Sequence, residues 1–329
     1  MIEFAQFGAG RIGQIHAGNL GRVAGARLRY VVDVDPRAAQ RLATQHGAKA
    51  ADRATALKDP AVGAVIIASS TDTHADLVIA SAEAGKAIFC EKPIDLSLAR
   101  VDACLAAVKK AGVPMLVGFN RRFDPSFKAL HDRLHAGEIG QIEQVIVTSR
   151  DPGLPPAEYL KVSGGQFRDM TIHDFDMARW LLGEEPVELY ATGSNLVEPW
   201  VGELGDVDSV MVVMRTASGK LAHINNSRRA VYGYDQRVEV LGSKGMLRAG
   251  NRTPTTVERS GGDAVASDKP LHFFLERYAE AYVAEMAHFI QAIGAGGKPS
   301  VGAKDGRQAL VLADAAVQSM KTGAAVKLG

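Results

Sequence analysis

Cysteine is nearly absent from this sequence. Among 329 residues there are two cysteines, Cys90 and Cys104, and they do not form a CxxC pair. Two cysteines cannot build the disulfide framework of a small secreted domain. We therefore expect two buried, reduced thiols and a reducing compartment, the cytoplasm.

The sequence also lacks an excess of charge of either sign and any long apolar run. Lys and Arg number 38 against 37 Asp and Glu, so the net charge is +1. Such a chain has no broad positive field for nucleic acid or for an anionic membrane surface. No apolar run approaches the roughly 20 residues of a membrane span, and the residues after Met1 read as a strand, not as a signal peptide. The expected partners are small molecules and other copies of the chain.

What is present is an ordinary globular composition, with 47% hydrophobic and 23% charged residues. The length suits about two domains. In the first third, short runs that are apolar on both faces alternate with helical stretches, which indicates buried strands in a parallel sheet. We expect strands at Ile2–Phe7, Leu28–Val32, Val62–Ala68, Ala87–Phe89 and Met115–Val117, and helices at Ile12–Val23, Arg37–Gln45, Thr73–Ala84 and Leu98–Lys110. The alternation predicts an α/β domain over residues 1–121, a doubly wound parallel sheet of the Rossmann type.

Two of these helices carry explicit start or stop signals. Asp35 precedes Pro36, which is a capping residue followed by proline at the first helical position. Ser97 is placed to cap the helix that runs to Lys110, and Gly112 is placed to end it.

The pattern changes near residue 120, so residues 122–329 are expected to form a second, α+β domain. Alternating segments there predict an open, mostly antiparallel sheet. We expect strands at Gln144–Ser149, Val187–Ser194, Ser209–Thr216, Lys220–Asn226 and Arg237–Leu241, and helices at Phe127–Ala136, Thr171–Leu182, Tyr278–Ala295 and Asp305–Lys321. The stretch Arg259–Pro270 is rich in Gly, Ser and Asp, which predicts a mobile surface loop.

A GxGxxG motif, Gly8-Ala9-Gly10-Arg11-Ile12-Gly13, follows the first strand directly and opens the first helix. Gly8 allows the tight turn, Gly10 lets the backbone approach a pyrophosphate, and Gly13 lets the helix pack close to the strand. The N–H groups at the helix start would face the phosphates. The motif therefore predicts a dinucleotide site that includes Arg11 and Ile12.

An acid stands at the expected distance from this motif. Asp33 lies 20 residues after Gly13, at the end of the second strand. A carboxylate there accepts both ribose hydroxyls of an adenosine and repels a 2′-phosphate, so the predicted cofactor is NAD. Arg37 could instead bind a 2′-phosphate, but we expect it to be an exposed helix charge.

Two further segments carry chemistry suited to oxidising an alcohol. Such a reaction needs a base that works near neutral pH, for which histidine is the natural candidate, and a cation near the oxygen. Lys92 lies at the carboxyl end of a parallel strand, where doubly wound folds bind ligands. Asp169, His173 and Asp176 would share one face of a helix. Alternatively, Thr171 with Asp174 could cap the helix and leave Asp169 in the preceding turn.

Other polar residues admit simpler interpretations. His131 and His135 have the spacing of metal ligands, but no third ligand is evident, so we expect an exposed helix and no metal. Arg228 and Arg229 are expected to be surface or ion-paired charges.

Together with GxGxxG, three segments resemble the glucose–fructose oxidoreductase / inositol dehydrogenase / rhizopine-catabolism (Gfo/Idh/MocA) family of NAD(P)-dependent sugar and polyol dehydrogenases. They are Thr71-Asp72-Thr73-His74, Glu91-Lys92-Pro93 and the run from Gly164 to Asp176. The resemblance covers essentially the whole chain and is greatest to the inositol 2-dehydrogenases. Gly118–Asp124, Ser149–Pro152 and Ser227–Arg237 support it.

The resemblance implies roles for individual residues. Lys92, Asp169 and His173 match the catalytic set: His173 would take the hydroxyl proton, Lys92 would polarise the oxygen and touch the nicotinamide ribose, and Asp169 would hold the substrate and tune Lys92. The remaining matches are Asp176, Arg122, Asp151 and Tyr232 for the substrate, and Thr71, His74 and Glu91 for the nicotinamide half of the cofactor.

The implied activity is oxidation of myo-inositol to 2-keto-myo-inositol (scyllo-inosose), a step of inositol catabolism. A dehydrogenase of scyllo-inositol or an aldose would use the same frame. A non-catalytic NAD-binding sensor is the alternative of another class, which loss of the Lys, Asp and His set would favour. The open sheet needs cover on its outer face, so we expect a homo-oligomer, by resemblance a tetramer.

Overall fold

The chain forms two compact units in a computed structural model that describes residues 1–329. The first unit contains Met1–Phe123 and Glu280–Leu310, and the second contains Asp124–Ala279 and Val311–Gly329. Glu280–Leu310 was predicted to belong to the second domain, residues 122–329. In the structure, Phe289 of this segment packs edge-on against Phe4, with ring centroids 6.1 Å apart, inside the first core. Periodicity identifies such a helix but not the core that it joins.

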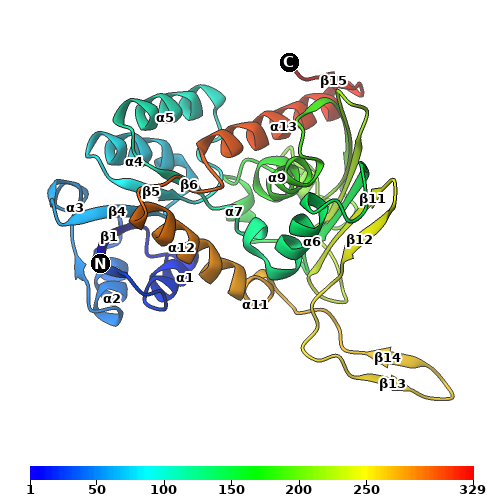
Figure 1. The fold of residues 1–329 in the computed structure, drawn as a ribbon, viewed down its shortest axis with the longest axis horizontal. Coiled ribbons are helices and arrows are strands. Elements are labelled where there is room, and N and C mark those ends of the chain that lie inside the picture. The colour runs from blue at the N-terminus through cyan, green and yellow to red at the C-terminus, as the bar shows by residue number, and fades with distance from the viewer. The chain divides into compact units, whose positions relative to one another are not determined.

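The first unit is built on a six-stranded parallel sheet in the order β3-β2-β1-β4-β5-β6 (Figure 1). Its strands are β1 (Ile2–Phe7), β2 (Ala26–Val32), β3 (Lys49–Ala50), β4 (Val62–Ile67), β5 (Ala87–Cys90) and β6 (Met115–Val117). Its helices are α1 (Arg11–Leu20), α2 (Pro36–Gln45), α3 (Arg53–Lys58), α4 (Thr71–Glu83), α5 (Leu98–Ala111), the 3₁₀ turn η1 (Asn120–Phe123) and α12 (Ala279–Gly294). This strand order is that of the Rossmann fold, as predicted. The sequence analysis missed β3 and α3, which are too short to show a period.

The predicted helix signals are partly confirmed. The Asp35 side chain accepts a hydrogen bond from the backbone N–H of Arg37, and Pro36 follows it. Gly112 ends α5 in the left-handed conformation, with φ of 68°. The prediction for Ser97 was wrong, because it stands at the N-cap of α5 but its side chain makes no capping bond.

The second unit contains a seven-stranded mixed sheet in the order β12-β11-β7-β10-β9-β8-β15. Its strands are β7 (Ile142–Arg150), β8 (Pro186–Ser194), β9 (Ser209–Thr216), β10 (Leu221–Ser227), β11 (Asp235–Gly242), β12 (Gly245–Ala249) and β15 (Val326–Lys327). Only β7 and β10 pair in parallel, so the predicted antiparallel character is confirmed. Along β9 the side chains alternate between buried and less buried, because one face of the sheet packs on a core and the other stays open.

Helices cover one face of this sheet. The helices of this unit are α6 (Pro125–His135), α7 (Ala157–Leu160), α8 (Gln166–Asp169), α9 (Thr171–Leu182), α10 (Trp200–Glu203), α11 (Phe274–Arg277) and the second part of α13 (Ala303–Thr322). Of these, α9 packs against β7 and β10 at the middle of the sheet. No helix of the structure is long and apolar enough to cross a membrane.

The stretch Arg259–Pro270 lies at the surface, as predicted, but it contains two paired strands and is not a loop throughout. It contributes to an exposed antiparallel hairpin of β13 (Glu258–Ser260) and β14 (Val265–Ser267), which extends away from the sheet in Figure 1. Thr255 and Asp268 close its base, with Thr255 N donating to Asp268 Oδ2 at 3.1 Å. The Gly and Asp residues that suggested a loop supply the turn between the two strands instead.

Candidate active site

The glycine turn between β1 and α1 has the shape of an anion site. Gly8 has φ of 103°, and a Cβ on it would lie 2.3 Å from the Ala68 carbonyl oxygen. A Cβ on Gly13 would lie 2.3 Å from the Gly8 oxygen, whereas a Cβ on Gly10 would have nothing within 4 Å. Gly8 and Gly13 are therefore needed by the fold itself, whereas Gly10 faces open space. No side chain caps the start of α1, so the N–H groups there are presented to a ligand.

Gln6 supports this turn, a role that was not predicted from the sequence. Its side chain is fully buried, and Nε2 donates to the carbonyl oxygens of Gly8 and Gly13, each at 2.8 Å. The only signal in the sequence is an amide within an otherwise apolar strand, since a buried amide needs partners.

Asp33 reaches back to the same turn from the end of β2. Its Oδ2 accepts a hydrogen bond from Ala9 N at 2.6 Å, and its Oδ1 accepts one from Asp35 N at 2.8 Å. A carboxylate has about four acceptor positions. It can therefore order the turn and still accept ribose hydroxyls, so the donor set of this turn fits a dinucleotide.

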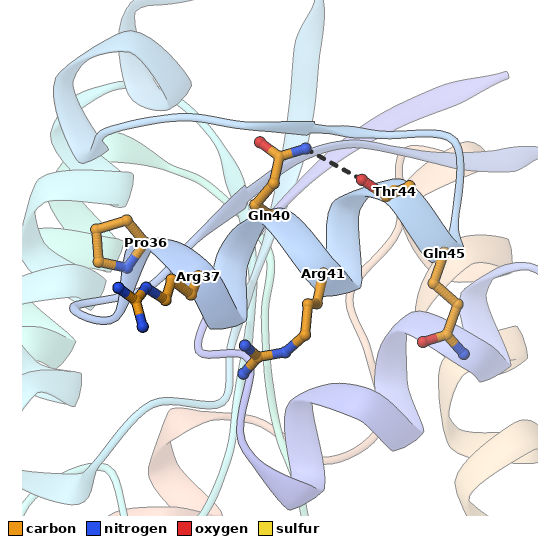
Figure 2. A pocket seen from close by; sticks show the side chains of 6 residues that line it. All are labelled: Pro36, Arg37, Gln40, Arg41, Thr44 and Gln45. Carbon is orange, nitrogen blue, oxygen red and sulfur yellow. Dashed lines mark hydrogen bonds between the residues drawn. The ribbon is translucent and has the colours of Figure 1, made fainter.

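A shallow pocket follows the exposed side of α2. Figure 2 shows the side chains that line it: Pro36, Arg37, Gln40, Arg41, Thr44 and Gln45. Gln40 and Thr44 bond to each other at 3.0 Å. Arg37 and Arg41 extend from the helix without a carboxylate partner, which agrees with the exposed helix charge expected for Arg37.

The turn after β5 carries Glu91, Lys92 and Pro93. Glu91 Oε1 lies 2.7 Å from Nε2 of the buried His16, and Glu91 Oε2 accepts from Lys92 N at 3.2 Å. The His74 ring is also buried, with Nδ1 2.8 Å from the Pro93 oxygen and Nε2 3.0 Å from the Ser69 oxygen. These contacts place two histidines behind the turn. His74 thus links the backbone after Lys92, through Nδ1, to the backbone after β4, through Nε2. Thr71, the fourth residue predicted for this region, is the first residue of α4.

A fully buried acid of α12 lies close to this turn. Glu285 of α12 is fully buried, and its carboxyl group has no hydrogen-bond partner. Burial, and secondarily the negative charge of Glu91, raise the pKa of Glu285 well above its usual range. Burial therefore favours the uncharged form of this acid. The sequence analysis did not single it out, because its surroundings come from distant parts of the chain.

In the second unit, Asp169 and His173 belong to two successive helices. Asp169 ends α8, and His173 lies half-buried in the first turn of α9. One predicted arrangement placed Asp169 and His173 on a single helix, and the other placed Asp169 in the turn before it. The structure shows Asp169 before the helix that carries His173. The predicted cap is absent, however: Thr171 Oγ1 bonds to Asn226 Oδ1 at 2.7 Å, and no side chain caps the start of α9.

Asp169 is held from two sides. Tyr159 donates its hydroxyl to Asp169 Oδ1 at 2.7 Å, and Arg228 Nη2 lies 3.1 Å from Asp169 Oδ2. Arg228 also lies 3.9 Å from Asp151, through Nη1. Arg228 is only 2% exposed, so it is the ion-paired charge that the sequence allowed and not a surface one.

A buried polar network fixes α9 to the sheet. Asn226 of β10 donates to Asp174 Oδ2 at 2.9 Å and to the Ser149 oxygen at 3.2 Å, in addition to its bond with Thr171. Because all of these groups are buried, their bonds fix the rotation of the helix. The helix in turn sets where His173 and Asp176 lie.

The other predicted substrate residues have these surroundings. Asp176 is buried, 3.7 Å from Arg179 Nη1. Arg122 is paired with Asp305 at 2.9 Å within the first unit. The Tyr232 hydroxyl donates to the buried Asp235 at 2.6 Å and accepts from Arg150 at 3.0 Å. Burial and the Asp235 carboxylate raise the pKa of Tyr232.

His131 and His135 of α6 do come together, with their Nε2 atoms 2.7 Å apart. The His131 ring stacks on Trp180 at 3.9 Å between centroids. Burial, and secondarily the charge of His135, lower the pKa of His131 to about 4. No group of three His, Cys, Asp or Glu side chains arranged to hold a metal ion is found in the structure.

Comparison with known proteins identifies both parts of the chain. Residues 2–119 match the family model described as the oxidoreductase family, NAD-binding Rossmann fold. Residues 127–248 match the model of the GFO/IDH/MocA C-terminal domain.

Similar proteins cover the full length. The chain is 52% identical over 322 residues to an inositol 2-dehydrogenase of Rhizobium meliloti, covering 97% of each chain. It is 48% identical over 329 residues to a myo-inositol 2-dehydrogenase of Thermotoga maritima, covering 99% of this chain and 98% of the relative. The crystal structure of a putative myo-inositol dehydrogenase from Sinorhizobium meliloti superposes with a TM-score of 0.97 at 50% identity, covering 100% of both chains.

Proposed function

Because the chain belongs to the Gfo/Idh/MocA oxidoreductase family and has its NAD-binding Rossmann domain, we propose that it is an NAD-dependent inositol 2-dehydrogenase. It would oxidise myo-inositol to 2-keto-myo-inositol (scyllo-inosose). The observation that carries the proposal is the full-length identity of 52% and 48% to two inositol 2-dehydrogenases. The chain also retains the Lys92, Asp169 and His173 set that a sensor could lose without penalty.

The reaction removes a hydroxyl proton and a hydride from one carbon of the substrate. NAD, when bound, supplies the hydride acceptor. The glycine turn would hold its pyrophosphate on the uncapped start of α1, through the backbone N–H groups of Arg11 and Ile12. Asp33 would accept the adenosine ribose hydroxyls and repel a 2′-phosphate. Thr71, Glu91 and Lys92 would line the nicotinamide half, with His74 behind them.

His173 is the proposed base. Imidazole titrates near neutral pH, so it can take the hydroxyl proton and return it to water. His173 is half-buried in the first turn of a helix fixed by the Asn226 network, which favours a constant orientation. We therefore propose that the His173 ring accepts the hydroxyl proton of the substrate.

Lys92 is the proposed electrostatic catalyst. Its ammonium group would stabilise the negative charge that develops on the oxygen as the proton leaves. Asp169 would bind a substrate hydroxyl and tune Lys92. The Tyr159 hydroxyl and the Arg228 guanidinium support this assignment, because they hold the Asp169 carboxylate in one position.

The proposed substrate is an uncharged polyol. Carboxylates bind such a molecule by accepting hydrogen bonds from its hydroxyls. Asp176 and Asp151 are the proposed acceptors of this kind. Arg122 is proposed to add a donor, in addition to its bond with Asp305. Tyr232 is proposed to offer its hydroxyl oxygen as an acceptor, because its one hydroxyl proton is donated to Asp235.

The proposed assembly is a homo-oligomer, a tetramer by resemblance. The open face of the seven-stranded sheet exposes apolar side chains: Ile146, Tyr190, Met211, Val213, Leu221 and Leu241. A contiguous apolar face of this kind is rarely left in water by a stable monomer.

Reduction of NAD and of NADP by the purified protein, with myo-inositol, scyllo-inositol and glucose in parallel, tests the proposal. The expected result is rapid reduction of NAD with myo-inositol, lost in His173→Ala while NAD binding is retained. Activity with only scyllo-inositol or glucose would agree with the proposed mechanism, but it would show that the substrate is not myo-inositol. Cofactor binding without turnover on any polyol would instead identify a sensor.

A further inference from the structure

Arg228 is among the largest fully buried side chains of the molecule, and nothing in the reaction described above uses it directly. It follows the last residue of β10, and its backbone N–H donates to the Asp208 oxygen at 2.9 Å. Removing a guanidinium from water is expensive, and a buried ion pair is a poor device for stability alone. Because burial of this guanidinium costs desolvation free energy, we expect Arg228 to serve a function.

The two partners of Arg228 are both carboxylates that the proposed function assigns to the substrate. Nη2 lies 3.1 Å from Asp169, and Nη1 lies 3.9 Å from Asp151. The two carboxylates are 11% and 20% exposed, against 2% for the arginine side chain. The cation therefore lies on the buried side, and the carboxylates lie nearer the solvent.

Electrostatics gives this arrangement a consequence. Two carboxylates close together repel each other, and one of them tends to take up a proton unless a cation compensates. A planar guanidinium can do so for both at once, because its N–H groups point in fixed directions. Tyr159 holds the second oxygen of Asp169, so that carboxylate is fixed at both ends.

We propose that Arg228 is a positioning residue that holds Asp169 and Asp151 as a pair of ionised acceptors at a fixed spacing, so that two hydroxyl groups of one polyol bind together. This inference rests on the proposed function. It adds a determinant of substrate class, since a ligand with a single hydroxyl would satisfy only one of the two carboxylates.

The chain offers a matched control in the next residue. Arg229 is exposed, and its guanidinium donates to the backbone oxygens of Leu196 and Val197, at 2.7 and 3.4 Å, and to no carboxylate. Arg228→Met removes the buried cation while keeping the length of the side chain, and Arg228→Lys keeps the charge without the planar fork. Arg229→Met removes an exposed cation of the same kind.

The experiment compares kcat and KM for myo-inositol across pH in the wild type and the three variants, together with NAD affinity. We expect Arg228→Met to lower kcat/KM by about tenfold or more, with unchanged NAD affinity, since it leaves charge-assisted contacts unmade. The acidic limb of the pH profile of Arg228→Met should move to higher pH, because a carboxylate without its cation protonates more readily. Arg228→Lys should restore the acidic limb but not KM, and Arg229→Met should match the wild type.

Two results would overturn the inference. One is an Arg228→Met enzyme whose KM and acidic limb equal those of Arg229→Met. The other, which applies even if the methionine variant does not fold, is an Arg228→Lys enzyme with the KM of the wild type. Absence of polyol oxidation by the wild type would instead contradict the proposed function, so the two failures are distinct.

Discussion

At the scale of single residues, Glu285 has unusual surroundings for a carboxyl group. A fully buried carboxyl group without a hydrogen-bond partner costs stability, and here it lies close to Glu91 and the Lys92 turn. Such departures gather at functional sites, where stability gives way to function.

The raised pKa of Glu285 predicts a specific dependence of stability on pH. The unfolded chain loses this proton above its ordinary pKa, whereas the folded chain keeps it, so the stability contributed by Glu285 is complete at low pH and falls as pH rises towards the folded pKa. Relative to Glu285→Gln, the wild type should lose up to about 1.4 kcal/mol of unfolding free energy per pH unit above about pH 5.

Denaturant unfolding of both proteins between pH 5 and pH 9 (roughly the span over which the linkage of one carboxyl would show) checks this. The exposed Glu83 supplies the control, since Glu83→Gln should follow the wild type throughout. A constant difference between the wild type and Glu285→Gln would show that Glu285 ionises normally.

The same scale shows where sequence reasoning stops. The turn glycines Gly8 and Gly13 could be predicted, because the GxGxxG spacing directly after a strand is a local sequence pattern. The contacts of Gln6, Arg228 and His74 could not, because they exist only once the chain has folded: Arg228 meets Asp169 and His74 meets the Pro93 oxygen from other parts of the sequence, and Gln6 meets the Gly8 and Gly13 oxygens only when the turn has formed. Residue type signals chemistry, but only the fold determines which partner a buried polar group meets.

At the scale of elements, the glycine turn allows folding and cofactor binding to be separated. Gly13→Ala would place a Cβ 2.3 Å from the Gly8 backbone oxygen, so this variant should be destabilised or fail to fold. Gly10→Ala meets nothing within 4 Å and has an ordinary negative φ of −71°, so its stability should stay within about 0.5 kcal/mol of the wild type.

Gly10→Ala should nevertheless lose NAD affinity, because its methyl group enters the space through which a pyrophosphate approaches the backbone. Calorimetric titration of NAD and thermal unfolding measure the two effects independently. Normal NAD affinity in Gly10→Ala would mean that the phosphates bind elsewhere.

Prediction at this scale was accurate where an element is long and periodic. The strands of the parallel sheet and helices such as α9 were found within a few residues. The short β3 and α3 carry too few residues to show a period, and the hairpin of β13 and β14 was hidden by its turn residues. The anchoring of α9 by Asn226 also escaped prediction, since its partners come from β7 and from α9 itself.

At the scale of the whole molecule, the open face of the seven-stranded sheet determines whether the chain works alone. Met211 and Val213 on β9 are 52% and 47% exposed, in the middle of that face. Replacing both with lysine would place repelling charges on an apolar interface, so the assembly should dissociate.

Light scattering of the purified Met211→Lys, Val213→Lys protein measures its mass directly. Val257→Lys is the control, because Val257 is 70% exposed just before the β13 hairpin strand, away from that sheet face. An unchanged oligomer in the double variant would show that copies of the chain meet through another surface.

The central claim is that the protein moves a hydride from one carbon of an inositol ring to NAD. Myo-inositol carrying deuterium on that carbon tests it most directly, with the reduced cofactor then analysed by mass spectrometry. The account predicts deuterium in the reduced cofactor and a ketone at the labelled carbon, both absent in His173→Ala. Reduced cofactor without deuterium, or no reduction at all, would contradict it.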